Sequence, residues 1–361
     1  MTQPQRIVGI DIGGANLKLA RWHSNDQVEC CAQTFELWKY PEQLARATAE
    51  MISQLGGADR LAVTMTGELA DCFATRREGV AKILAQLSQV LPPTALDVYT
   101  VDGQWLSPAA AEADPWRVAA SNWHALARWL SRWSQTSQAC QNALIVDIGS
   151  TTVDVIPMSH GQIMTTAKTD RQRLERGQLV YTGIARTPVC AVVSQVELQS
   201  QTIPVMAEFF ATVDDAYLIL GLIPESPSDC HTADGRPRTI AGAHGRLARM
   251  IGEDAETLAI ASARHLAEQV LMAQAQQVAT AIARNWKLLT SSESPISNAP
   301  ALDTSPYLVC TGHGAPLMNC VLPLLSPQPL HCLQLDSLLP EAAARSAPAV
   351  AVAWLLMAEQ G

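Results

Sequence analysis

The sequence lacks several features that would place the protein in a familiar class. Its longest late apolar run, 347–358, is shorter than the roughly 20 residues that a membrane-spanning helix needs. It has no block of Lys and Arg, and its net charge of −9 argues against nucleic acid and anionic membranes as partners. The nine cysteines form no Cys-x-x-Cys pair, which argues against a structural zinc site or a disulfide framework.

The first residues also lack the pattern of a secretory signal, because residues 1–6 lead directly into an apolar strand. We therefore expect a cytoplasmic protein with reduced thiols. What the sequence does contain is a chain of 361 residues, 48% hydrophobic and 16% charged, which is long and apolar enough for two lobes with large cores.

Two segments, 8–18 and 144–154, follow the same order of residue types. Each begins as an apolar strand, reaches an Asp, turns through Gly and small hydroxyl residues, and continues as a second strand. The turns are built from Gly13, Gly14, Gly149, Ser150, Thr151 and Thr152. Small residues let an anion approach the backbone N–H groups of a turn, so the pair predicts binding of a phosphate or diphosphate. Asp11 and Asp147, each at a strand end, are placed to hold Mg²⁺.

Strands alternate with helices along the chain, which indicates an α/β fold, and three strands before the first helix indicate a mixed sheet. The expected strands are 6–22 (a hairpin), 28–37, 60–65, 97–101, 144–157 (a second hairpin), 163–167 and 307–310. The expected helices are 41–55, 77–90, 114–133, 254–286, one from about 315, and 340–357, with a mobile surface loop over 290–306.

The two hairpins and the later strand–Gly–x–Gly–helix at 309–314 resemble the actin, Hsp70 and sugar-kinase superfamily. The resemblance implies two ribonuclease H-like lobes with mixed sheets around a central cleft, where a nucleotide lies. It places the first lobe at 1–140 and the second at 141–361, with an inserted segment at about 170–260. His313, the residue between the two glycines, departs from the superfamily pattern, and its bulk argues against adenine at this turn.

A closer resemblance covers nearly the whole chain. The segments that carry it are 9–16, 65–73, 120–123, 147–154, 168–170, 179–183, 186–189 and 232–235. They resemble the hydantoinase/oxoprolinase-related proteins of tetrahydromethanopterin- and methanofuran-linked one-carbon metabolism, although Gly67 stands where that family is expected to have Ala. The resemblance implies a transferase that condenses an aminomethyl-furanmethanol diphosphate with the phenol of γ-glutamyltyramine, or of a tyrosine-like acceptor, and releases diphosphate.

This reaction assigns roles to particular residues. The catalytic candidates are Glu68, Asp71 and Asp154, one of the first two being the base for the phenol. The candidates for binding substrate or diphosphate are Asp11, Gly13, Gly14, Asn16, Lys18, Asn122, Gly149, Ser150, Thr151, Thr152, Lys168, Arg186 and His313. The candidate Mg²⁺ ligands are Asp11 and Asp147. Without the resemblance, Lys168 and Arg186 read as surface charges, and Asp71 as a helix cap.

Two other functions stay open from the sequence. The first is an ATP-dependent enzyme of the same superfamily, either a small-molecule kinase or a hydantoinase/oxoprolinase-like amidohydrolase, which the short chain and His313 disfavour. The second is a non-catalytic sensor of a phosphorylated metabolite. The expected partners are small-molecule substrates, and the oligomeric state is left open, with a homodimer as one option.

Overall fold

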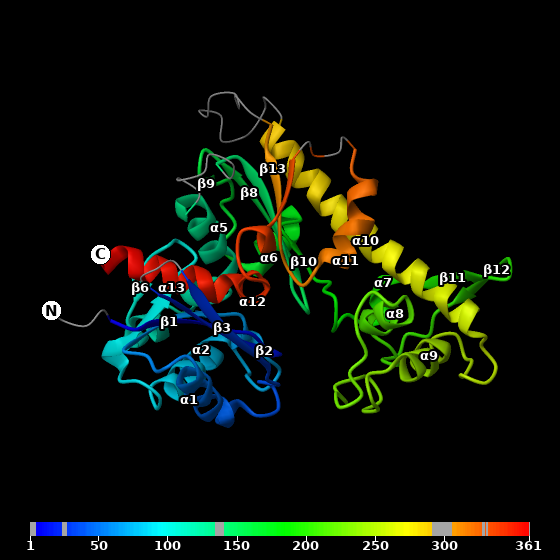
Figure 1. Ribbon diagram of the computed structural model, residues 1–361, viewed down its shortest axis with the longest axis horizontal. Helices are drawn as coiled ribbons and strands as arrows, with labels where there is room; N and C mark the ends of the chain where they lie inside the picture. The colour runs from blue at the N-terminus through cyan, green and yellow to red at the C-terminus, as the bar shows by residue number, and fades with distance from the viewer. Residues whose placement is uncertain are drawn as a thin grey trace.

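The computed structural model describes residues 5–23, 27–133, 141–290, 305–326, 329 and 331–360. It contains two large mixed sheets with helices packed against them (Figure 1). The first sheet has the order β3-β2-β1-β4-β5-β6. Its strands are β1 Ile7–Ile12, β2 Asn16–Trp22, β3 Val28–Thr34, β4 Arg60–Met65, β5 Leu96–Tyr99 and β6 Trp105–Leu106.

The second sheet repeats the plan of the first. Its order is β10-β8-β7-β13-β14, with β9 paired to β8. Its strands are β7 Ala143–Ile148, β8 Val153–Ser159, β9 Gln162–Ile163, β10 Leu179–Val180, β13 Tyr307–Gly312 and β14 His331–Gln334. In both sheets a central strand, β1 or β7, pairs antiparallel with the next strand in sequence and parallel with a later one. This repeated topology confirms the predicted α/β fold with two ribonuclease H-like halves.

The helices pack on both faces of these sheets. Those of the first half are α1 Leu44–Gln54, α2 Arg76–Leu87, α3 Pro108–Ala113, α4 Pro115–Val118 and α5 Asn122–Trp133. The final helix, α13 Ala347–Gln360, lies between the two sheets beside α5 (Figure 1). Nine of the 14 residues of α13 are buried, as expected for a helix whose first ten residues are almost all apolar. It closes one core cluster with side chains from β1, α5, β7 and β13.

The remaining helices and a small hairpin lie in the second half. They are α6 Asp170–Arg176, α7 Val189–Val192, α8 Val213–Ile219, α9 Ile240–Arg249, α10 Ile260–Thr290, α11 Ala315–Val321 and α12 Glu341–Arg345, with the hairpin β11 Gln195–Leu198 and β12 Gln201–Pro204. Helix α10 runs from the second sheet to the region that contains α8, α9 and this hairpin (Figure 1). A fully buried ion pair, Arg246 Nε to Asp215 Oδ1 at 2.8 Å, ties α9 to α8.

Three predicted elements were wrong in extent. The helix predicted over 114–133 is two helices, because Ala119 pairs with Met65 at the end of β4 and Ala120 adopts φ 49°. The helix predicted over 340–357 breaks at Ser346, and α13 begins at the next residue with Pro348, which lacks an N–H, in its first turn. The strand predicted over 163–167 ends at Ile163.

Other predictions are confirmed with small shifts at their ends. The long helix begins at Ile260 rather than 254 and extends to Thr290. The loop predicted over 290–306 lies mostly outside the described residues, as does the predicted lobe boundary near 140. Within the part of the chain that the structure describes, none of the helices combines the length and apolarity needed to cross a membrane.

Candidate active site

The two predicted turns face each other between the sheets. The amide Nδ2 of Asn16, in the first turn, donates to Oγ of Ser150, in the second, at 3.1 Å. Each turn closes with a backbone hydrogen bond, from Gly13 N to Asn16 O at 3.0 Å and from Gly149 N to Thr152 O at 2.9 Å. Together the turns line a cavity of about 100 Å³, which we call the diphosphate cavity.

Backbone amides of both turns lie at this cavity with unused hydrogen-bonding capacity. Within the described ranges, five turn amides donate to no protein acceptor: those of Gly14, Ala15, Ser150, Thr151 and Thr152. All five residues line the diphosphate cavity. A set of N–H groups converging from two turns is an anion-binding arrangement.

The carbonyls of the same turns accept hydrogen bonds from two neighbouring segments. Segment 35–37 donates to the first turn, from Leu37 N to Gly14 O at 3.0 Å. Segment 183–186 donates to the second, from Arg186 N to Ser150 O at 3.0 Å. Gly183 lies so close that a Cβ there would sit 2.4 Å from Thr151 N. Each turn is therefore fixed by its carbonyls, which leaves its amides for a ligand.

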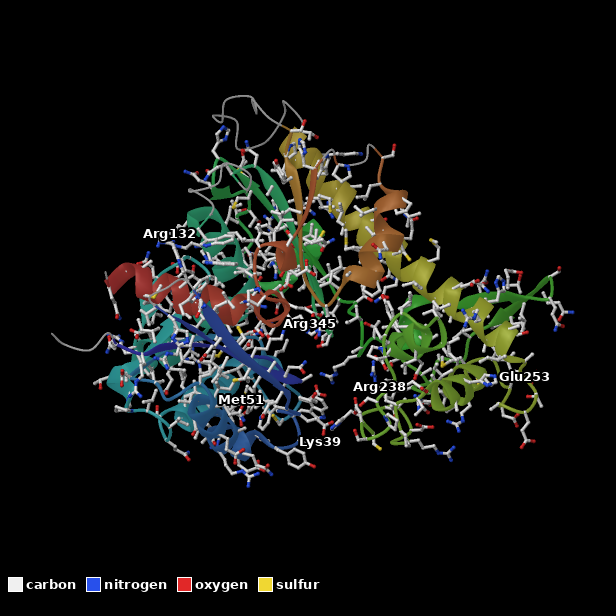
Figure 2. The ribbon with its side chains drawn as sticks, viewed as in Figure 1. Lys39, Met51, Arg132, Arg238, Glu253 and Arg345 are labelled. Carbon is white, nitrogen blue, oxygen red and sulfur yellow. The ribbon has the colours of Figure 1, made fainter. Side chains whose placement is uncertain are left out.

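Three carboxylates surround the diphosphate cavity. Asp147 and Asp154 face each other across the β7–β8 pair, and Asp11 comes from β1. Burial raises the pKa of Asp11 to about 6, with Lys18 opposing the rise and Asp154 adding to it. Burial, then Asp154, raises the pKa of Asp147 to about 7. Lys18, whose charge opposes both rises, donates from Nζ to the carbonyl of Arg345 at 2.7 Å. Figure 2 shows Arg345 at the junction of the two halves.

Asp154 has a partner that the sequence analysis missed. Arg173 Nη2 donates to Asp154 Oδ1 at 2.7 Å, and both side chains are buried. The guanidinium also stacks over the ring of Trp123 at 4.4 Å. Burial raises the pKa of Asp154, while Arg173 opposes the rise through charge and a hydrogen bond. Arg173 lies on a different element, α6, and no local pattern marks it.

A second cavity of about 340 Å³ adjoins the first, and we call it the acceptor cavity. The two share six lining residues: Gly14, Thr66, Asn122, Thr151, Thr152 and Asp154. The acceptor cavity has aromatic and apolar walls at Trp38, Leu69 and Tyr181, and polar groups at Asp71 and Arg186. The arrangement places a partly apolar space directly beside the turn amides that have no protein acceptor.

The two predicted base candidates lie in different surroundings. Asp71 is exposed and lines the acceptor cavity. Glu68 is fully buried and lines neither cavity, with Arg76 Nε 3.9 Å from its Oε1. Burial raises the pKa of Glu68 to about 7, and Arg76 opposes this. Arg76 in turn binds Asp170, which lines the acceptor cavity.

Two further candidates line neither cavity. Lys168 is exposed and belongs to the lining of neither cavity. His313 donates its backbone N–H to Ile148 O at 2.8 Å, and burial followed by the charges of Lys18 and Arg345 lowers its pKa to about 4. A Cβ on Gly312 or Gly314 would sit 2.3 Å from Ile148 atoms, so these glycines allow the close approach to β7.

Comparison with known proteins gives the family. The sequence model of hydantoinase/oxoprolinase matches residues 59–355, most of the chain. The chain belongs to the hydantoinase/oxoprolinase family. This confirms the resemblance that the eight sequence segments predicted.

Two relatives within this family carry the same name, "(4-{4-[2-(gamma-L-glutamylamino)ethyl]phenoxymethyl}furan-2-yl)methanamine synthase". The protein from Methanocaldococcus jannaschii is 34% identical over 250 residues, which are 69% of this chain and 72% of the relative. The protein from Methanococcus vannielii is 33% identical over 114 residues, 32% of this chain and 51% of the relative. Because both relatives are synthases, this hydantoinase/oxoprolinase family member is an enzyme.

A solved structure of similar fold is a nucleotide-free acetone carboxylase from work on ATP-dependent acetone carboxylation. It covers 97% of this chain and 70% of its own, with a TM-score of 0.57 and 11% identity. At this sequence identity, the similarity shows only that this hydantoinase/oxoprolinase family member and the carboxylase chain share a fold.

Proposed function

We propose that this enzyme joins a furfuryl diphosphate, of the aminomethyl-furanmethanol type, to the phenol oxygen of a tyramine- or tyrosine-like acceptor and releases diphosphate. The observation that carries the proposal is the set of five turn amides without protein acceptors beside a cavity with aromatic walls. The names of the two relatives support it, since each describes a synthase whose product has a phenoxymethyl-furan linkage.

The chemistry suits these residues. The bond between the furfuryl carbon and the bridging oxygen breaks, and its electron pair leaves with diphosphate. A lone pair of the phenol oxygen forms the new C–O bond, and the phenolic proton passes to a base. The furan ring stabilises positive charge on the carbon, so the protein must mainly bind the departing diphosphate and position the phenol. The amides at Gly14, Ala15 and Ser150–Thr152 serve the first task.

A Mg²⁺ ion fits the donors of the diphosphate cavity. Asp11 Oδ1 is buried without a hydrogen-bond partner, and the charge of Asp11 adds to burial and to Asp154 in raising the pKa of Asp147. Among the described residues, no three His, Cys, Asp or Glu side chains are grouped to hold an ion. Two carboxylates are nevertheless enough for Mg²⁺, which keeps waters and takes its remaining ligands from phosphates. When bound, the ion would neutralise charge on the leaving diphosphate.

We assign the base to Asp71. A free phenol has a pKa of about 10, so it needs a carboxylate or a cation nearby to lose its proton near neutral pH. Of the two candidates, only Asp71 lines the acceptor cavity. Glu68 acts behind it as a positioning residue, through Arg76 and Asp170. Asp154, which accepts a hydrogen bond from Arg173, is a positioning residue at the edge shared by the two cavities.

The test is product formation without a nucleotide. Protein incubated with the furfuryl diphosphate, γ-glutamyltyramine and MgCl₂ is expected to form one ether per diphosphate released, as measured by mass spectrometry and a diphosphate assay. A strict requirement for ATP with formation of ADP would instead favour the alternative, an ATP-dependent kinase or amidohydrolase. The homodimer, the cytoplasmic location and the lobe boundaries stay predictions.

A further inference from the structure

Two side chains from opposite halves of the protein contact each other at the acceptor cavity. Trp38 comes from the loop after β3, and Arg186 from the loop before α7. The guanidinium carbon of Arg186 lies 4.2 Å from the centroid of the Trp38 ring, and both residues line the cavity. Trp38 is half-buried and Arg186 is exposed, so the contact sits at the solvent side of the site. We call this contact the clasp.

Each of the two clasp residues is attached through the backbone to one of the proposed diphosphate-binding turns. Leu37, the residue before Trp38, donates its N–H to Gly14 O at 3.0 Å. Arg186 donates its own N–H to Ser150 O, also at 3.0 Å. The backbone of each turn therefore helps to hold one of the two clasp residues in place.

A second contact joins the same loop of the first half to the second half. His231 Nδ1 lies 3.5 Å from Glu36 Oε1, and Glu36 also binds Lys39 at 2.9 Å. Figure 2 shows Lys39 at the edge of the first half that faces the region containing Arg238. The loop at 36–39 thus makes its contacts with the second half next to the acceptor cavity.

We propose that the clasp shields the furfuryl carbon from water and thereby sets the ratio of ether formation to hydrolysis. This inference rests on the proposed function. A carbon that carries positive charge reacts with whichever nucleophile is nearest, and a closed cavity removes water as a competitor of the phenol. In the hydrolytic reaction, water supplies the oxygen of the new C–O bond, its proton goes to solvent, and diphosphate leaves with the bonding electrons as before.

The test compares two products of one reaction. We expect Trp38→Leu and Arg186→Ala to lower the ratio of ether to furfuryl alcohol by about 2- to 5-fold, the scale of a lost cation–π contact at an exposed site. Trp38→Phe, which keeps a ring, should restore most of the ratio. Lys39→Ala is the matched control, because Lys39 Nζ lies 5.9 Å from the same ring but belongs to the same half of the protein. It should leave the ratio unchanged.

The possible results separate the two proposals. If Trp38→Leu releases diphosphate at an unchanged rate with an unchanged ratio of ether to alcohol, the clasp is refuted and the proposed function stands. If the wild-type protein forms no ether from any phenolic acceptor, the proposed function fails and the clasp fails with it. A fall in the ratio in Lys39→Ala equal to that in Trp38→Leu would also refute the clasp, because it would show a nonspecific effect of the loop.

Discussion

Replacing Gln274 tests how the second turn, residues 149–152, is held in place. Gln274 lies on α10, and its side chain is fully buried. Its Oε1 accepts from the hydroxyl of Tyr217 at 2.9 Å, and its Nε2 donates to Thr182 Oγ1 at 2.9 Å and to Gly183 O at 2.8 Å. Gly183 in turn lies directly against the backbone of Thr151. One amide therefore joins the long helix to the turn.

Gln274→Leu keeps the volume but leaves the buried Tyr217 hydroxyl without a partner, and it removes one hydrogen bond each from Thr182 Oγ1 and Gly183 O, which keep their bonds to Thr187 Oγ1. At about 1–3 kcal/mol for the unpaired hydroxyl and about 0.5–1.5 kcal/mol for each other lost hydrogen bond, we expect a loss of about 2–5 kcal/mol in the free energy of unfolding. Because Gly183 has no free space, its movement shifts the turn amides. The loss of one amide hydrogen bond to the charged diphosphate, about 1.5–3 kcal/mol, would weaken diphosphate binding roughly 10- to 100-fold.

The assay measures stability and binding separately. Urea unfolding gives the change in stability, and calorimetry with inorganic diphosphate and MgCl₂ gives the change in affinity. Tyr217→Phe is the control, because it removes the hydroxyl and leaves both Nε2 hydrogen bonds of Gln274 intact. It should cost about 1–3 kcal/mol of stability, because Gln274 Oε1 loses its partner, without a change in affinity. A folded Gln274→Leu protein that binds diphosphate as tightly as wild type would refute the reasoning.

Three further predictions concern the carboxylates. Burial raises the pKa of Glu68 from 4.5 to about 7, so the folded state holds this proton more tightly than the unfolded state. The stability that protonated Glu68 contributes is therefore fully present below about pH 4.5 and is lost as the pH rises through 7. Glu68→Gln should accordingly be more stable than wild type by about 1–3 kcal/mol near pH 8 and no more stable near pH 4, as measured by urea unfolding; a difference independent of pH would contradict this. Asp147→Asn should raise the melting temperature of the metal-free protein and abolish the further rise that MgCl₂ with diphosphate gives wild type. Asp71→Asn should slow ether formation by about 10²- to 10⁴-fold while diphosphate affinity stays constant in calorimetry; a weaker affinity would indicate a binding role instead.

The hairpins were predictable because their signal is local. An apolar strand, an Asp and a turn of small residues occupy consecutive positions, and the turn residues themselves determine how closely an anion can approach. The paired pattern therefore predicted the two antiparallel hairpins, which the structure confirms, while anion binding by their turns stays a prediction. The predicted family followed from short segments of the same kind.

Residues that act through tertiary contacts were not predictable in this way. Arg173 and Gln274 lie on helices whose sequences do not reveal which group they contact across the fold. Glu68 follows a buried strand, which suggested a side chain facing the cleft. In the structure α2 packs at Gly79 so tightly that a Cβ there would sit 2.1 Å from Glu68 O, and the carboxyl is enclosed in the interior. The orientation of Glu68 thus depends on a helix contact that is distant in sequence.

The bond that breaks is the central claim, and an oxygen-18 label tests it most directly. The furfuryl diphosphate is prepared with oxygen-18 at the position that bridges the furfuryl carbon and phosphorus, and both products are analysed by mass spectrometry after a single turnover. Cleavage between carbon and oxygen, stabilised by the turn amides at Gly14 and Ser150–Thr152, predicts that all of the label leaves in the diphosphate. Label that stays with the furfuryl product would show cleavage between phosphorus and oxygen, and would contradict the account.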